Sequence, residues 1–516
     1  MSYSETVNYL YNLQKYGIKF GLDNISRLMS ALDNPHRSFL SVHVAGTNGK
    51  GSTSAIIASI LKTAGFKVGL FTSPHIISFT ERIRVNGEEI TESEVVSLAE
   101  EIRTRIEDTP SLTLPPRGGG QGWGGEVKLN PTFFEVVTAM ALLYFKRKKV
   151  DIAVIEVGMG GRLDATNIIT PEISIITNIS YDHKEFLGDT LKEIAHEKAG
   201  IIKKGVPVVA SYQESEAMKV IEQKAIEKNS ELYIYGRDFS SVLKRNDSSG
   251  ICFDYSSGDS FAINNLVLPL AGEHQMQNAS VAIKAVELLS EKLTSDFSFP
   301  TSNKNLHLYS SPSPTPPIKG GEEVVMPPVE GEGDYRFLNT TPHHFVRKGL
   351  EDVRWPGRLE IIKEDPPILI DGAHNPAAAM ALSEALKKNF LGENKRIILV
   401  LGIMGDKDAR GIMEPLLPLA SEIIFTAPAY SRSASPEKLA GIAASLGFFD
   451  VRIAPTMKDA VEMATEIGLS DKRQGLGNLP HNPSPAPLIL ITGSFYTIGE
   501  AKEVLGQRGI LARLRE

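Results

Sequence analysis

A glycine-rich loop with a central lysine is the strongest chemical signal in this sequence. Residues 46–53 read Gly-Thr-Asn-Gly-Lys-Gly-Ser-Thr, between the apolar run SVHVA and the helical pattern TSAIIASILKTAGF. Glycines let backbone N–H groups approach a phosphate, and the N-terminus of a following helix favours an anion. Lys50 would neutralise the outer phosphates of a nucleotide, and the hydroxyl of Ser52 or Thr53 would reach Mg²⁺. The loop therefore predicts a nucleotide-phosphate site.

The loop departs from the usual phosphate-loop pattern at two positions. Val44 stands where the pattern has its first glycine, and Gly51 separates the lysine from Ser52. The structural alternative is an ordinary glycine turn that caps a helix. Three glycines around a lysine are more than such a cap requires, so we favour the phosphate site.

Polar side chains follow three other apolar runs, each near the end of a predicted strand. Ser73 follows KVGLFT, Glu156 ends VDIAVIE, and His183 comes shortly after EISIITNIS. In open α/β sheets, ligands bind beyond the carboxyl ends of the strands. Taken singly, a strand-end glutamate can cap a turn, and a lone histidine is more often a structural residue. Together, beside a phosphate loop, they predict a Mg²⁺ shell that water and phosphate oxygens complete.

A second polar motif, Asp371-Gly-Ala-His374-Asn375-Pro376, follows the apolar run PPILI late in the chain. Asn375 as an N-cap, with Pro376 at the first helical position, gives this motif a purely structural explanation. Asp371 and His374 nevertheless follow a predicted strand, where a ligand could reach them. Arg358, in Trp-Pro-Gly-Arg, adds a cation nearby, although alone it reads as a surface arginine in a turn.

Two α/β units are needed to position these residues. β-branched runs alternate with helical patterns in both halves of the chain, which predicts largely parallel sheets. We expect a phosphate-loop and substrate unit at 1–297, a Pro/Gly/Ser-rich insertion at 298–344 and a smaller α/β unit at 345–516. Residues 109–131 and 472–487 have a similar Pro/Gly-rich composition, which favours exposed loop insertions over a polyproline ligand for a partner.

The composition excludes several classes of protein. The 516 residues carry 55 Lys and Arg against 62 Asp and Glu, so no overall positive charge favours nucleic acid or an anionic membrane. Cys252 is the only cysteine, which rules out an intramolecular disulfide and a multi-cysteine zinc site. The N-terminus lacks a signal-peptide pattern, and no apolar run is long enough to span a membrane. We therefore expect a cytoplasmic protein.

In this order, the motifs resemble the folylpolyglutamate synthase/dihydrofolate synthase family, the folate branch of the Mur ligases. The resemblance implies a P-loop Mur-ligase-like domain with a largely parallel sheet, and a smaller Rossmann-like α/β domain after it. GTNGK is shared with other Mur ligases, whereas TSPH, SFTERIRVNG and DGAHNP point to the folate branch. The matching stretches are HVAGTNGKGSTSA, LFTSPHIISFTERIRVNG, FFEVVTAMALLYF, VDIAVIEVGMGGRLDATN, NISYDHKEFLGDTLKEIAHEKAGIIK, GEHQMQNASVA, RWPGRLE, ILIDGAHNP, LGIMGDKD and LITGSFYTIGEA.

The resemblance implies an ATP-dependent amide ligase. ATP would phosphorylate a substrate carboxylate to an acyl phosphate, and the amine of L-glutamate would displace the phosphate. The carboxylate would belong to dihydropteroate in dihydrofolate synthesis, and to the terminal glutamate of a reduced folate in polyglutamylation. The family makes a monomer the expectation.

The resemblance also implies roles for individual residues. Lys198 matches a lysine that carries a carbamate in this family, although alone it reads as a solvated helix lysine. Catalytic roles fall on Lys50, Glu156, His183 and Lys198; ATP binding on Thr47, Asn48, Gly49, Lys50, Gly51, Ser52, Asn278, Arg358, Asp371 and His374; and Mg²⁺ on Ser52, Ser73, Glu156 and His183. Pteroate binding falls on Gly21, Leu22, Asp23, Thr132, Phe133, Phe134, Glu135 and Leu163. Phe133 and Phe134 read equally well as helix core.

Other functions remain alternatives at this point. The chain could be restricted to polyglutamylation, or could be a cell-wall Mur ligase, against which the folate-branch motifs argue. A nucleotide-dependent switch would use the phosphate loop for regulation but leaves DGAHNP unexplained. An inactive binding protein is disfavoured because Lys50, Ser73, Glu156 and His183 are all present.

Overall fold

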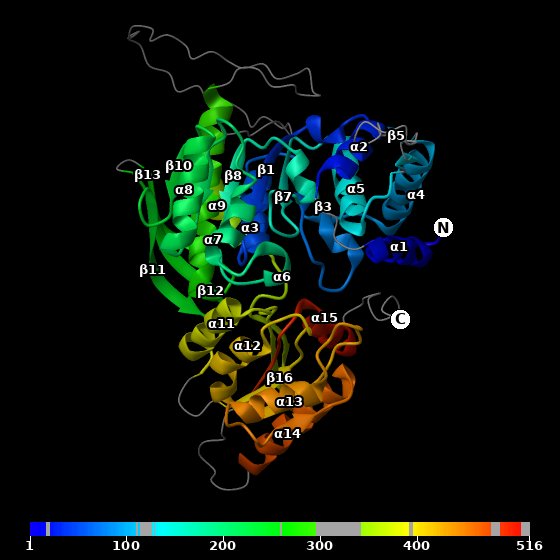
Figure 1. The fold of residues 1–516 in the computed structure, drawn as a ribbon. Coiled ribbons are helices and arrows are strands. Elements are labelled where there is room, and N and C mark those ends of the chain that lie inside the picture. Colours follow the sequence, from blue (N-terminus) through cyan, green and yellow to red (C-terminus); the bar gives the residue numbers. More distant parts are fainter. Residues whose placement is uncertain are drawn as a thin grey trace, which may run out of the picture.

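The computed structural model confirms an α/β protein with two units, drawn one above the other in Figure 1. The structure describes residues 1–16, 21–109, 112–113, 126–127, 129–258, 261–295, 342–391, 396–475 and 486–506. We call the blue-to-green part the N-terminal unit and the yellow-to-red part the C-terminal unit. Within the described ranges, no helix combines the length and apolar character that crossing a membrane requires.

The main sheet of the N-terminal unit has eight strands in the order β10-β9-β8-β1-β7-β2-β3-β4. The strands from β10 to β2 are parallel, whereas β3 and β4 run antiparallel at one edge. Val44 of β1 pairs with Glu156 of β7, and Ala45 pairs with Ile176 of β8. The carboxyl ends of these three strands therefore meet at one edge. The bounds are β1 Leu40–Ala45, β2 Val68–Phe71, β3 Ile83–Val85, β4 Glu88–Glu89, β7 Ile152–Glu156, β8 Ile173–Ile176, β9 Val208–Ala210 and β10 Leu232–Ile234.

Helices cover both faces of this sheet. On one face, α3 and α9 bury Ile56 and Ile283 with Val42 of β1 in one apolar cluster. On the other face, α5 contributes Val137 and Phe145 to a second cluster. The helices are α1 Tyr3–Asn12, α2 Asp23–Ala31, α3 Lys50–Thr63, α4 Glu92–Asp108, α5 Phe133–Lys148, α6 Lys184–Leu187, α7 Leu191–Ala199, α8 Ser215–Glu227 and α9 Glu273–Ser295, with 3₁₀ turns at Leu13–Tyr16, Pro35–Arg37, Phe79–Arg82 and Ala165–Ile168.

A three-stranded antiparallel sheet packs on α9 and was not anticipated from the sequence. Its strands are β11 Phe239–Asp247, β12 Gly250–Ser257 and β13 Phe261–Leu268, in the order β11-β12-β13. Buried and less buried positions alternate along β12, as expected when one face of a strand meets the core. A short ribbon, β5 Leu112–Thr113 and β6 Glu126–Val127, lies within the first Pro/Gly-rich segment.

The C-terminal unit is a six-stranded sheet in the order β14-β15-β19-β16-β17-β18, parallel except for β14. Asn375 caps α11, where its side chain accepts a hydrogen bond from the N–H of Ala378, and Pro376 opens the helix, as predicted. The bounds are β14 Glu360–Glu364, β15 Pro367–Ile370, β16 Ile397–Leu401, β17 Ala420–Phe425, β18 Arg452–Ile453, β19 Leu488–Thr492, α11 Pro376–Asn389, α12 Ala409–Leu416, α13 Pro436–Ser445, α14 Met457–Gly475 and α15 Phe495–Val504, with a 3₁₀ turn at Leu417–Leu419.

Helix α10, Pro342–Glu351, joins the N-terminal unit although it follows the long insertion. Phe345 and Leu350 belong to the same apolar cluster as α3 and α9, and the hydroxyl of Ser59 donates to the carbonyl of Gly349 at 2.6 Å. The boundary predicted at residue 345 falls inside α10, and this packing favours a boundary after Val353. The predicted insertion at 298–344, except for its last residues in α10, lies outside the described residues.

Candidate active site

The glycine loop between β1 and α3 has the geometry of a phosphate site. Gly46 and Gly49 have φ values of +150° and +88°, a region that glycine adopts without strain. The side-chain hydroxyl of Thr47 donates to the carbonyl of Ser180 at 3.0 Å and accepts from its N–H at 3.1 Å, which ties the loop to the segment after β8. The first-turn N–H groups of α3 have no acceptor within the helix and are available to an anion.

Two lysines converge on the carbonyl of Gly46. Lys50 Nζ donates to it and to the carbonyl of Thr47, both at 3.1 Å, and Lys198 Nζ donates to the same Gly46 oxygen at 2.8 Å. Burial, assisted by the neighbouring charge of Lys50, lowers the pKa of Lys198 to about 7. Lys198, on α7, is thus a buried amine at the phosphate loop and not a solvated helix lysine.

Glu156, at the end of β7, is buried beside the loop. Its carboxylate accepts a hydrogen bond from the backbone N–H of Ser73 at 3.0 Å. Burial raises the pKa of Glu156 to about 7, although the nearby charge of Lys50 opposes that change. A buried carboxylate is costly to ionise, and a cation bound beside it would offset that cost.

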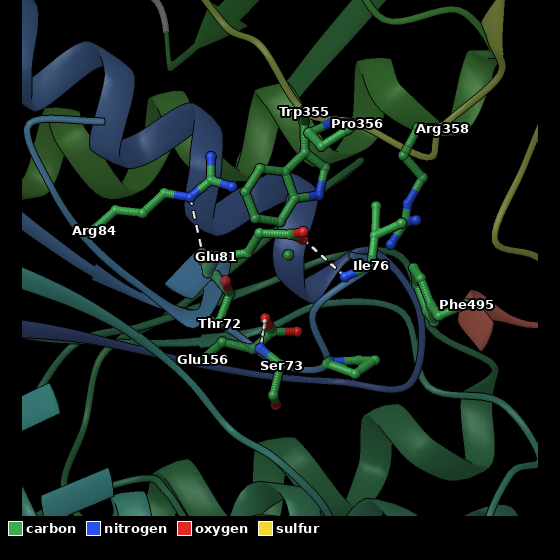
Figure 2. Close-up of a pocket in the computed structure, with 12 residues that line it drawn as sticks. Thr72, Ser73, Ile76, Glu81, Arg84, Glu156, Trp355, Pro356, Arg358 and Phe495 are labelled. Carbon is green, nitrogen blue, oxygen red and sulfur yellow. Dashed lines mark hydrogen bonds between the residues drawn. The ribbon is translucent and has the colours of Figure 1, made fainter. Parts of the chain in front are cut away.

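A pocket lies between the two units at this point (Figure 2). Figure 2 shows Glu156 and Ser73 on one side, with Trp355 and Arg358 on the other. The Arg358 guanidinium lies over the ring of Phe495, 4.8 Å from the ring centroid, and this cation–π contact restricts its position. The lining residues are Gly51, Thr72, Ser73, Pro74, Ile76, Glu81, Arg84, Glu156, Trp355, Pro356, Arg358 and Phe495.

The loop from β2 to β3 forms a large part of this pocket, which the sequence did not reveal. Glu81 accepts hydrogen bonds from the N–H groups of Ile76, Ile77 and Ser78 at 2.7 to 2.8 Å, which fixes the loop. Ile76 packs among apolar side chains of the C-terminal unit. These residues lie in the matched stretch LFTSPHIISFTERIRVNG, but their types alone suggest no chemistry.

Of the other predicted ATP residues, Asn278 lies at the loop and Asp371 lies beside Arg358. A Cβ on Gly49 would be 2.3 Å from the Asn278 side-chain oxygen, so Asn278 lies directly against the loop. Asp371 accepts hydrogen bonds from the N–H groups of Leu359 at 3.0 Å and Ala373 at 2.8 Å. Burial raises the pKa of Asp371, and the charge of Arg358 opposes this. Asp371 therefore supports the segment that carries Arg358.

His183 lies in a different environment from Ser73 and Glu156. Its backbone is left-handed, with φ +49°, at the start of α6, and its Nε2 lies 3.4 Å from Lys407 Nζ of the C-terminal unit. Partial desolvation, with the nearby charges of Lys407 and Lys50, lowers the pKa of His183 to about 4, so the ring is neutral and can act as a metal ligand. In this arrangement the ring faces Lys407.

The donor set fits a hard cation such as Mg²⁺ in part. Among the described residues, no group of three or more His, Cys, Asp or Glu could hold a metal. The buried carboxylate of Glu156 and the hydroxyl of Ser73 share one pocket with Gly51 of the loop. The Thr53 hydroxyl, one residue beyond Ser52, is buried without a hydrogen-bond partner. Oxygen donors beside a phosphate loop suit Mg²⁺, which takes most of its ligands from water and phosphate.

The predicted pteroate residues fall into two groups. Phe133 stacks on Tyr11 with ring centroids 5.3 Å apart, and the Arg82 guanidinium lies 5.5 Å from the Phe133 ring. Phe134 packs against Phe71, at 6.0 Å, and against Gly158. Both rings are half-buried, so they belong to the edge of the core.

The other predicted pteroate residues have local structural roles. The Thr132 N–H donates to Glu135 Oε2 at 2.7 Å, and the Glu135 N–H donates to the Thr132 hydroxyl at 3.3 Å, a capping box at the start of α5. Leu22 precedes α2 and packs against the core of α5. Gly21 and Asp23 flank it, and Leu163 is half-buried in the turn after β7.

Comparisons with known proteins match both units. The Mur ligase middle domain model matches residues 117–286, and the Mur ligase glutamate ligase domain model matches residues 357–475. A dihydrofolate synthase/folylpolyglutamate synthase of Bacillus subtilis (strain 168) is 32% identical, over 98% of this chain and 99% of its own length.

Solved structures agree with this result along the whole chain. A Mycobacterium tuberculosis folylpolyglutamate synthase complexed with ADP has a TM-score of 0.78 at 28% identity, covering 98% of this chain and 100% of the other. A folylpolyglutamate synthase complexed with AMPPCP and folate has a TM-score of 0.69 at 30% identity, with the same coverage. Proteins similar to this chain thus bind a nucleotide and a folate.

Proposed function

Because this chain belongs to the dihydrofolate synthase/folylpolyglutamate synthase family of Mur ligases, we propose that it joins L-glutamate to dihydropteroate and to reduced folates. The single observation that carries this proposal is the pocket shared by the two units. Gly51 of the phosphate loop and Glu156 come from one unit, and Arg358 comes from the other. A ligase that brings ATP and a carboxylate together needs a site of this kind, with cations to offset the charge of two anions.

The reaction that we propose is the one that the family resemblance implies. A carboxylate oxygen of the acceptor attacks the γ-phosphorus of ATP, and ADP leaves as the acyl phosphate forms. The amine of L-glutamate then attacks the acyl carbon, gives up a proton, and inorganic phosphate leaves. Lys50 lies at the loop and Arg358 across the pocket, so both can stabilise charge on the moving phosphoryl group.

We propose that Ser52, Ser73, Glu156 and His183 hold Mg²⁺ with the phosphates. When bound, Mg²⁺ would draw negative charge from the phosphoryl oxygens during transfer. For His183 to join Glu156, its ring must turn away from Lys407. We further propose that Lys198 accepts CO₂ as a carbamate, since about half of an amine with a pKa of about 7 is in its neutral, reactive form at pH 7.

For the acceptor, we propose that the pteroate ring lies near Phe133 and Phe134, two half-buried aromatic side chains at the edge of the core. Other residues would form the wall of the acceptor site beside these rings through the backbone segments to which they belong. They are Gly21, Leu22, Asp23, Thr132, Glu135 and Leu163. We also propose a monomeric, cytoplasmic enzyme; light scattering on the purified protein tests the monomer.

The test is ADP release by the purified enzyme with Mg-ATP and L-glutamate. Parallel reactions contain dihydropteroate, tetrahydrofolate or no acceptor, and products are identified by mass. Glutamate addition to both acceptors is expected. Addition to tetrahydrofolate alone would restrict the enzyme to polyglutamylation. ATP hydrolysis that ignores every acceptor would overturn the proposal and favour a nucleotide switch.

A further inference from the structure

Asp182 belongs to the N-terminal unit, and its side chain contacts residues of the C-terminal unit. Its Oδ1 accepts a hydrogen bond from Lys407 Nζ at 2.6 Å, and its Oδ2 accepts one from Asn375 Nδ2 at 3.3 Å. His374 Nε2 lies 3.6 Å from the same Oδ2. The side chains of Asp182 and Lys407 are only 9% and 10% exposed, so this is a buried ion pair between units.

The same cluster reaches the phosphate loop through a pair of amides. Asn375 Nδ2 donates to Asn48 Oδ1 at 2.9 Å, and Asn48 Nδ2 donates back to Asn375 Oδ1 at 3.3 Å. Asn48 also donates to the hydroxyl of Ser180, two residues before Asp182. Asn375 is the N-cap of α11, so the start of that helix is fixed relative to the loop that binds phosphate.

A buried ion pair is a poor explanation for the stability of the fold. The Asp182–Lys407 pair is better explained by a role in orienting one unit relative to the other. Removing two charges from water costs several kcal/mol, which their attraction repays only in favourable geometry. A second ion pair between the units, Glu273 with Lys388, has the same N···O distance of 2.6 Å, but its side chains are 47% and 54% exposed. Such a surface pair contributes little. The buried pair and its hydrogen-bonded neighbours are satisfied together in the arrangement of the two units seen here.

We propose that Asp182 is a positioning residue that fixes the C-terminal unit on the phosphate loop by holding Lys407 and Asn375. This inference rests on the proposed function, because the ligase pocket needs Arg358 opposite Glu156. Without Asp182, each unit keeps its own core, and the approach of Arg358 to the pocket becomes variable. The chemical step should then slow more than nucleotide binding weakens, since the loop itself belongs to one unit.

Two variants and one control test the inference kinetically. Asp182→Asn keeps the shape and removes the charge, and Lys407→Met removes the other partner. For each we expect kcat to fall at least tenfold and the Kd for ADP to change less than threefold. The double variant should be no more than threefold slower than the slower single variant, because the two residues act through one contact. Glu273→Gln, which removes only the exposed pair, should leave kcat unchanged.

A distance measurement makes the test independent of turnover. Spin labels on Val242→Cys and Phe449→Cys, which are 61% and 79% exposed in different units, report the distance between units in a Cys252→Ser background. We expect a narrow distribution with intact Asp182 or with Glu273→Gln, and a broader one with Asp182→Asn or Lys407→Met. The inference would be overturned if the distance distribution were unchanged in both Asp182→Asn and Lys407→Met. It would also be overturned if the loss of kcat in the double variant equalled the product of the two single losses. A protein that failed to ligate glutamate would refute the proposed function, yet its distances would still decide the role of Asp182.

Discussion

Asn278 of α9 lies against Gly49 of the phosphate loop so closely that residue 49 has no room for a side chain. A Cβ there would come within 2.3 Å of the Asn278 side-chain oxygen, and the backbone φ is +88°. A side chain at this position would therefore need both a left-handed backbone and a shift of the Asn278 amide. The contact also explains how a helix that begins more than 200 residues later shapes the phosphate site.

Gly49→Ala should weaken nucleotide binding. The new methyl group must displace Asn278 or the loop, and a left-handed alanine costs about 1–2 kcal/mol in addition. We expect the Kd for ADP, measured by calorimetry, to rise at least tenfold. The matched control is Gly236→Ala, where φ is also +88° but no atom lies within 4 Å of the added carbon. Equal effects on ADP binding in the two variants would contradict a steric role for Asn278.

Arg358→Ala should impair the use of ATP while the protein remains folded. The guanidinium faces the pocket from the C-terminal unit and is held there by Phe495. We expect kcat/KM for ATP to fall about 100-fold, as for the loss of one charged transition-state contact. Arg354→Ala is the control, since Arg354 is exposed and, within the described part of the chain, donates only to the carbonyls of Glu351 and Val353. Unchanged kinetics in a folded Arg358 variant would refute the assignment.

Glu156→Gln should lower turnover and remove one pH-dependent contribution to the free energy of unfolding. Turnover should fall at least about 100-fold, because the pocket loses its buried carboxylate. The pKa of Glu156 is about 7 in the folded protein, above its ordinary value of 4.5. Between these values the unfolded chain releases a proton that the folded protein keeps, so wild-type stability falls as pH rises through this window. Without Mg²⁺, denaturant titrations should show this loss in the wild type, at up to about 1.4 kcal/mol per pH unit relative to the variant.

His43 should make the folded protein less stable as the pH falls, whereas Glu156 makes it less stable as the pH rises. This buried histidine of β1 lies 2.9 Å from the hydroxyl of Thr166, and burial lowers its pKa from 6.5 to about 3. Below pH 6.5, His43 takes up a proton in the unfolded chain but stays neutral in the folded protein. The free energy of unfolding therefore decreases as the pH falls. Relative to His43→Gln, the wild type should lose up to about 1.4 kcal/mol per pH unit between pH 6 and 4. Parallel stability curves would show that His43 is not responsible.

Much of the site could be predicted because strand ends in a parallel sheet meet at one edge. The phosphate loop and Glu156 follow neighbouring strands β1 and β7, so their proximity follows from topology. The antiparallel sheet β11–β13 was missed because its short alternating runs stand between stronger helical patterns. Glu81 and Phe495 were missed because they act through loop geometry and packing, which no spacing in the sequence reveals.

The sequence by itself determined the fold class, the family and the phosphate loop, because each depends on local patterns of glycine, charge and apolar periodicity. Only the tertiary structure decided which side chains meet across the two units. Asp182 and Lys407 are 225 residues apart, and their contact depends on how two separately packed cores dock. The burial that gives Lys198 and Glu156 their shifted pKa values arises in the same way, since local sequence cannot specify how much water a folded chain excludes.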